Sequence, residues 1–200
     1  VDAAYSDLIA KLKELEAKAG TDDGVWRFDK GAEFYDYALQ RTTTTKMTAD
    51  EIHELGLQEV ARIHGEMEAI MKQVEFSGTL QDFFQYMRTD KQFYYPNDEA
   101  GKQRYLDEAT ALIDGMRTKL PDFFGTLPKA EIEVKAVEPY REKSAGKAFY
   151  NRPAPDGSRP GIYYANLYNM DNMPVYQMEA LAFHEGIPGH HMQLAIAQEL

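Results

Sequence analysis

Apolar residues recur every three or four positions through most of the first 125 residues, a spacing that is typical of amphipathic helices. The first run ends at Gly20, Thr48 opens the longest run with a capping box, and Thr79 caps a further one. The β-branched tract Thr42–Thr45 predicts an extended link, and Pro121 ends the last run. The pattern predicts helices at about residues 5–15, 31–41, 48–74, 79–87 and 97–120.

The pattern changes after residue 125. Ile132–Ala136 alternates apolar and charged residues, as a half-buried strand does, and the aromatic and β-branched Gly161–Leu167 predicts a second strand. Pro and Gly residues make Asn151–Gly161 a loop, and Pro174 suits the first turn of a last helix. We therefore expect one domain over residues 1–200 that is mainly α with a small β element (α+β), helical over 1–125, with strands and the last helix over 126–200.

Composition and charge exclude several classes of protein. The 200 residues include 22 Lys and Arg against 33 Asp and Glu, which gives a net charge of −11 and argues against binding of nucleic acid or anionic lipid. No run of about 18 apolar residues predicts a membrane span. The absence of Cys excludes disulfides, cysteine-based metal sites and cysteine nucleophiles.

One segment within the last predicted helix is unusual. His184 and Glu185 are followed by two glycines, Pro188, and then His190 and His191. In a helix interior the proline and the glycines cost roughly 5 kcal/mol relative to alanine, and the proline cannot donate a backbone hydrogen bond. The helix must therefore bend or bulge just after His184, and such a cost is typical of a functional site.

The segment can be compared with the His-Glu-x-x-His pattern of zinc proteases, in which two histidines lie four residues apart on one helical face. Pro188 occupies the position of the second histidine, so the strict pattern fails. A two-residue bulge would bring His190, six residues after His184, onto the same face. His191 is the alternative second ligand, although it lies ~10.5 Å along a straight helix. The other interpretation is that these histidines cap a helix end or form hydrogen bonds within the core.

Two imidazoles and a third protein ligand leave an open position on zinc for a water molecule, and zinc lowers the pKa of that water toward about 7. The residue types thus predict zinc ligation by His184 and His190, with Glu185 as the general base. Tyr164 and Asn166 are candidate substrate-binding residues, because the strand that carries them could offer an edge to a peptide and a tyrosine hydroxyl can stabilise an oxyanion. An aromatic strand packed in a core is the alternative.

The string HEGIPGHHMQ resembles the signature of the bacterial "domain of unknown function 885" family. Further landmarks in the same order are Gly24–Arg27, Thr42–Thr45, Thr48–Gly56, Phe124–Pro128 and Gly161–Asn166, so the resemblance covers nearly the whole chain. It implies a zincin-like metallopeptidase fold, zinc-hydrolase activity and a cell-envelope or periplasmic location with lipid anchoring. It also implies a third ligand, a Glu in a Glu-Gly-Trp context, which is absent from these 200 residues.

We therefore expect the central fragment of a longer zinc-dependent hydrolase, most directly a metallopeptidase that acts on a peptide or other amide substrate. The third ligand then lies outside this chain, and the fragment alone is expected to be inactive. Two alternatives stay open. One is a non-catalytic helical binding module that keeps the bent helix, and the other is a metal-dependent hydrolase of non-peptide amides or esters.

Overall fold

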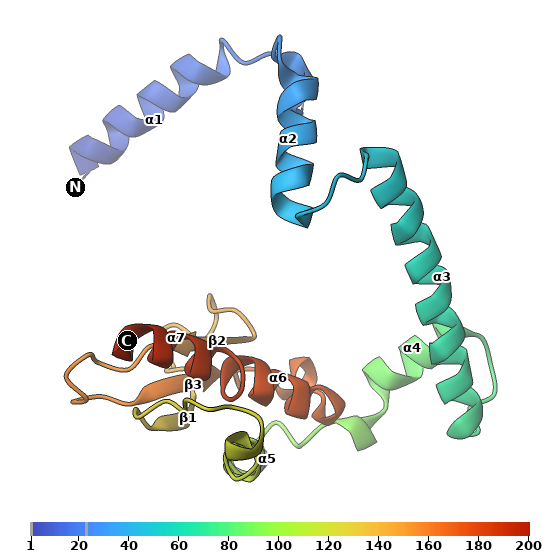
Figure 1. Ribbon diagram of the computed structural model, residues 1–200. Coiled ribbons are helices and arrows are strands. Elements are labelled where there is room, and N and C mark those ends of the chain that lie inside the picture. The colour runs from blue at the N-terminus through green and yellow to red at the C-terminus, as the bar shows by residue number, and fades with distance from the viewer. Residues whose placement is uncertain (1, 23) are drawn as a thin grey trace. The chain divides into compact units, whose positions relative to one another are not determined.

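The computed structural model describes residues 2–22 and 24–200, which form seven α-helices and three β-strands (Figure 1). This mainly helical α+β composition confirms the predicted fold class. The helices are α1 (Asp2–Glu16), α2 (Gly31–Thr43), α3 (Ala49–Gln73), α4 (Leu80–Thr89), α5 (Glu99–Arg117), α6 (Met178–Glu185) and α7 (His190–Glu199); the strands are β1 (Ile132–Ala136), β2 (Ala148–Asn151) and β3 (Gly161–Ala165).

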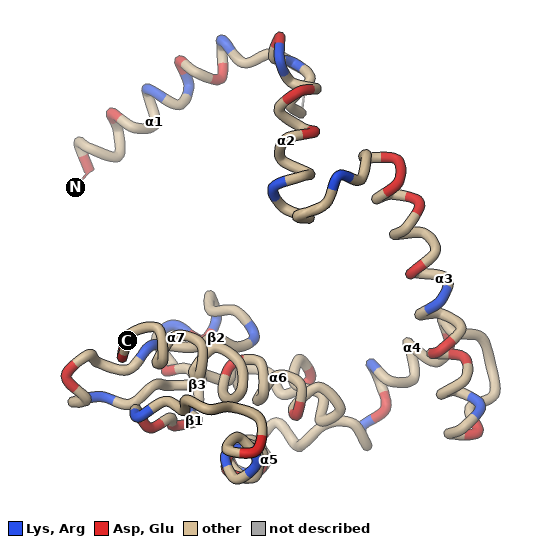
Figure 2. The backbone as a smooth tube through the Cα atoms, viewed as in Figure 1, with Lys and Arg blue, Asp and Glu red and all other residues tan. Residues whose placement is uncertain are grey.

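The chain divides into two compact units between Ser77 and Gly78, and the expectation of a single domain stays a prediction. The first unit holds α1, α2 and α3. The predicted capping box is confirmed at the start of α3, where the side chain of Thr48 accepts from the Glu51 amide and the Glu51 carboxylate accepts from the Thr48 amide. Charged residues of both signs lie along α1, and Glu14 pairs with Lys11 within the helix and with Lys18 just after it (Figure 2).

The extended link expected at Thr42–Thr45 is wrong for its first half. Helix α2 continues through Thr43, whose hydroxyl donates to the carbonyl oxygen of Leu39 over 2.8 Å. Thr44 then ends the helix in the left-handed region, with φ 57°. A threonine hydroxyl within a helix can bond back to the carbonyl oxygen of the preceding turn, so this β-branched residue is accommodated in the last turn of α2.

The second unit, Gly78–Leu200, contains a three-stranded sheet in the order β1-β3-β2. Strand β3 lies in the centre, parallel to β1 and antiparallel to β2. The two predicted strands are confirmed, while the short β2 was not predicted. Because β3 is central, the expectation that it offers an edge to a substrate is wrong: β1 and β2 are the outer strands.

Helices α5, α6 and α7 cover one face of this sheet (Figure 1). Alternate residues of β3 point to opposite faces, so Tyr163 and Ala165 enter the main core while Ile162 and Tyr164 belong to a smaller cluster on the other face. The main core joins α5 to α6 and to the segment between α6 and α7. Its members from these elements include Tyr105, Ala109, Ile113, Met178, Ala182 and Ile187.

Candidate metal centre

The last predicted helix is interrupted at Gly186–Gly189, so that α6 ends at Glu185 and α7 begins at His190. The predicted distortion is therefore present, but it is a complete break between two helices rather than a bulge within one. Pro188 has no amide hydrogen to donate, and the Ile187–Pro188 peptide bond is cis. Across the break, the amide of His191 donates to the carbonyl oxygen of Gly186 over 3.0 Å.

Both glycines of the break lie where a side chain would collide with backbone. A Cβ added at Gly189 would lie 1.9 Å from the carbonyl oxygen of His184, and one at Gly186 would lie 2.7 Å from that of Ala182. Glycine therefore permits the close approach of the start of α7 to the end of α6. These contacts are made by residues that lie between His184 and His190 in the chain, so we expect them to affect the distance between the two histidines.

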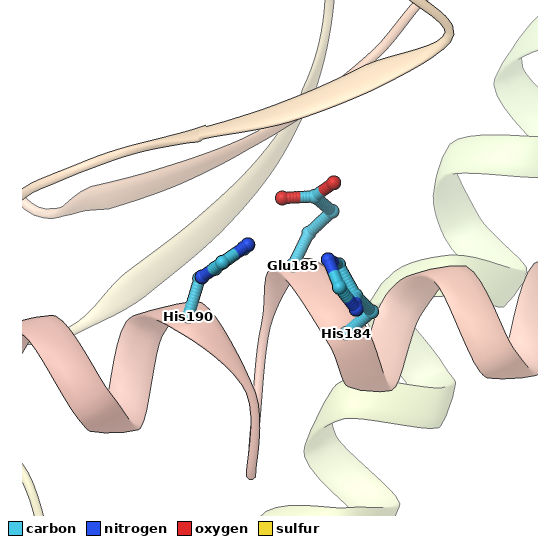
Figure 3. A group of neighbouring side chains, drawn as sticks. All are labelled: His184, Glu185 and His190. Carbon is cyan, nitrogen blue, oxygen red and sulfur yellow. The ribbon is translucent and has the colours of Figure 1, made fainter. Parts of the chain in front are cut away.

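The break brings His184, Glu185 and His190 together on one side of the two helices (Figure 3). One ligand atom from each of the three residues lies within 4.8 Å of the other two. The two imidazole rings approach edge to face, with centroids 4.7 Å apart. Among the described residues, no further His, Asp or Glu joins this group. Two imidazoles are donors that zinc accepts, and a carboxylate lies beside them, so the residues present fit part of the coordination of such an ion.

His191, the alternative second ligand, is engaged elsewhere. Its side chain is 1% exposed. Its Nδ1 atom pairs with the Tyr150 hydroxyl over 2.8 Å, and its Nε2 pairs with the carbonyl oxygen of Ala130 over 3.0 Å. Burial lowers the pKa of His191, which favours the neutral ring. With both nitrogens occupied, His191 does not join the cluster, and the structure favours His190 of the two candidates.

The cluster lies beside a small cavity of about 340 Å³. Glu185 is 7% exposed and lines this cavity with His190 and Leu194, opposite the outer strand β2. Ala148, Phe149 and Tyr150 form the β2 wall. A partly enclosed space next to a carboxylate and two imidazoles is where a substrate bond could meet reactive groups.

The candidate substrate-binding residues Tyr164 and Asn166 are not brought to this cluster. The Tyr164 hydroxyl donates to Glu138 over 3.0 Å, on the face of the sheet opposite α6. The Asn166 amide donates to three carbonyl oxygens of the preceding loop, those of Glu142, Ala145 and Gly146. Their polar groups thus serve the local fold, and their proposed role in substrate binding stays a prediction.

Sequence reasoning missed one tyrosine next to the cluster, Tyr150, whereas Tyr163 lies on the strand that was expected to offer an edge to a peptide. Tyr150 lies on β2 and lines the cavity, and burial raises its pKa to about 12. Tyr163 is fully buried, and burial raises its pKa. No local signal marks Tyr150, because its position depends on pairing of β2 with β3 across the intervening loop.

The sequence matches, over residues 1–200, the family described as "Bacterial protein of unknown function (DUF885)". The chain belongs to this family. The resemblance inferred from the HEGIPGHHMQ string is thereby confirmed, whereas the zinc-hydrolase activity that it implies is not part of the family's description. No curated protein matches the chain.

One solved structure with a similar fold is described as "The crystal structure of the putative lipoprotein from Colwellia psychrerythraea". It superposes with a TM-score of 0.84 at 31% sequence identity, over 98% of this DUF885 chain and 34% of that protein. The chain thus spans about a third of the length of its structural neighbour. None of the helices within residues 2–22 and 24–200 has the length and apolar character needed to cross a bilayer.

Proposed function

We propose that this DUF885 chain carries part of the active centre of a zinc-dependent hydrolase, most directly a peptidase. The observation that supports the proposal is the convergence of His184, Glu185 and His190, whose ligand atoms lie within 4.8 Å of one another across a broken helix. The glycines and the proline of the break disfavour a continuous helix. The interruption that they cause lies between the residues that converge.

In this proposal His184 and His190 hold the ion, and the third ligand implied by the family resemblance lies outside these residues. When bound, zinc supplies a Lewis acid that polarises the scissile carbonyl and acidifies a water molecule. Glu185 is the general base: a carboxylate oxygen accepts a proton from the attacking water and delivers it to the leaving nitrogen of the amide. The low exposure of Glu185 limits competition from bulk water for this carboxylate.

The outer strand β2 favours a peptide as the substrate. The amide of Asn166 donates to the carbonyl oxygen of Lys147, which makes this pair a hydrogen-bonded one in the antiparallel β2–β3 ladder. By the alternation of such ladders, the backbone groups of Ala148 and Tyr150 point away from β3, toward the free edge. Both residues line the cavity beside Glu185, so an extended peptide could add to β2 with its backbone next to the cluster.

We also propose that the protein acts in the cell envelope. The support is the similarity to the Colwellia protein, which is described as a "putative lipoprotein". A lipid anchor would attach such a protein to a membrane without a spanning helix. Fractionation of cells, followed by a metabolic lipid label, tests this part of the proposal.

The reaction is tested with the full-length protein, freed of metal by a chelator and then given zinc, on a library of quenched fluorescent peptides. Glu185→Gln keeps the size of the side chain and removes the base, and we expect kcat to fall by about 10²–10⁴-fold. Glu179→Gln, the same change at an exposed position of α6, should leave kcat unchanged. Peptidase activity retained by Glu185→Gln would rule out the mechanism. Esters in a parallel assay test the alternative substrate class.

A further inference from the structure

His191 directly follows the proposed ligand His190, and it connects α7 to β2 and to the segment before β1, at the two edges of the sheet. Its Nδ1 atom bonds to Tyr150 on β2, and its Nε2 bonds to the carbonyl oxygen of Ala130, two residues before β1. Because β1 and β2 flank β3, these two hydrogen bonds link His191 to segments on either side of the central strand. Its own backbone amide also closes the helix break through Gly186.

The partners of the ring determine its tautomer. The carbonyl oxygen of Ala130 can only accept, so Nε2 of His191 carries the hydrogen and donates it. In the neutral ring Nδ1 is then an acceptor, and the Tyr150 hydroxyl donates to it. Tyr150 is thereby held in one direction, with its ring on the wall of the cavity next to Glu185 and His190.

The surrounding residues are arranged around this contact. Gly161 of the central strand lies beneath it: a Cβ there would lie 2.3 Å from the Tyr150 hydroxyl and 2.6 Å from Nδ1 of His191. At the other end of α7, the carboxylate of Glu199 accepts from the backbone amides of Lys129 and Ala130. Ala130 is thus bonded on its amide side by Glu199 and on its carbonyl side by His191.

We propose that His191 is a positioning residue of the candidate metal centre: its bond to Tyr150 fixes the start of α7, and with it His190, against the outer strand β2. The inference rests on the proposed function, because it assigns His190 to the ion. The inference goes beyond the proposed function because it gives His191, the second histidine of the His190-His191 pair, a separate role. His191 neither binds the ion nor reacts; it sets the distance between the ligand helix and the strand that would receive substrate.

The test uses substitutions that remove one hydrogen bond at a time. Tyr150→Phe removes the donor. His191→Gln can still donate to Ala130 with its amide nitrogen but offers Tyr150 no acceptor at the place of Nδ1, whereas the Asn oxygen of His191→Asn lies near that place. Tyr140→Phe is the control, because it removes the same hydroxyl from a residue that is 83% exposed. Zinc dissociation constants of the full-length protein and its variants are measured by competition with a chromophoric chelator, at a temperature where circular dichroism shows every variant folded.

We expect Tyr150→Phe and His191→Gln each to weaken zinc binding by about tenfold, the size usual for residues that orient metal ligands. The double variant should bind zinc as tightly as either single variant, because the two substitutions remove the same hydrogen bond. His191→Asn should bind zinc more tightly than His191→Gln, and Tyr140→Phe should equal the wild type. A role in folding alone would lower the melting temperature without changing the zinc affinity of the folded protein.

Two results would overturn the inference, and they differ in what they leave standing. If the wild type binds zinc and Tyr150→Phe binds it equally well, or the double variant shows the sum of two independent losses, His191 is not a positioning residue while the proposed function stands. If the wild type and all variants bind no zinc, the proposed function fails and the inference fails with it.

Discussion

The backbone of Gly189 lies against the carbonyl oxygen of His184, so closely that a Cβ at position 189 would be 1.9 Å from that oxygen. Real Cβ atoms do not approach a backbone oxygen to this distance, so any side chain there must move α7 away from α6. The His184 and His190 rings lie 4.7 Å apart on the two helices that meet at this contact. The geometry of the cluster thus depends on a residue that has no side chain.

Gly189→Ala should therefore separate the two histidines. We expect a melting temperature several degrees lower, as for overpacking that costs about 1–3 kcal/mol, together with a loss of zinc affinity. Gly115→Ala is the matched control, because nothing lies within 4 Å of a Cβ at this exposed position of α5. It should stabilise the protein by roughly 0.5–1 kcal/mol and leave zinc binding unchanged. Equal zinc affinity in both variants would show that the break does not set the geometry of the cluster.

Asn166 offers a test of whether a predicted substrate-binding residue is structural. Asn166→Asp keeps the size of the side chain but removes the amide hydrogens that three loop carbonyls receive. We expect the free energy of unfolding to fall by about 1–3 kcal/mol, the cost of leaving such groups without partners. Zinc affinity and KM should stay unchanged, since Asn166 does not join the cluster. A raised KM in a variant of undiminished stability would restore the role in substrate binding.

The ion pair of Glu138 and Arg141 gives a pH dependence with a definite sign. The Arg141 guanidinium, bonded to Glu138 over 2.5 Å, lowers the pKa of this carboxyl below its ordinary value of 4.5. A lowered pKa in the folded state means that the pair stabilises the protein above about pH 4.5 and that this contribution is lost as the pH falls through the lowered value. Glu138→Gln should thus melt below the wild type at pH 7, and the gap between the two melting temperatures should narrow as the pH falls below 4.5. A gap that is independent of pH would contradict this account.

Local chemistry explains which features the sequence predicted. Capping at Thr48 and Thr79 depends only on residues three positions away, and both caps are present. The break after His184 follows from the backbone properties of proline and glycine. These features need no knowledge of tertiary structure.

The features that failed or were missed depend on pairing across long separations. Strand β3 is central because β1 and β2 pair on either side of it, which no pattern within Gly161–Leu167 indicates. Strand β2 has only four residues, too few for a periodic signal. The bond of Tyr150 to His191 joins residues 41 positions apart, so it could not be predicted from spacing.

Zinc binding by the cluster tests the central claim most directly. At pH 7 in chelator-free buffer, titration of the metal-free full-length protein should show one zinc site that His184→Ala and His190→Ala each abolish. His64→Ala, a change at an exposed histidine of α3, should bind zinc as the wild type does. A protein that binds no zinc, or one whose zinc affinity is unaltered by His184→Ala and His190→Ala, would contradict the account.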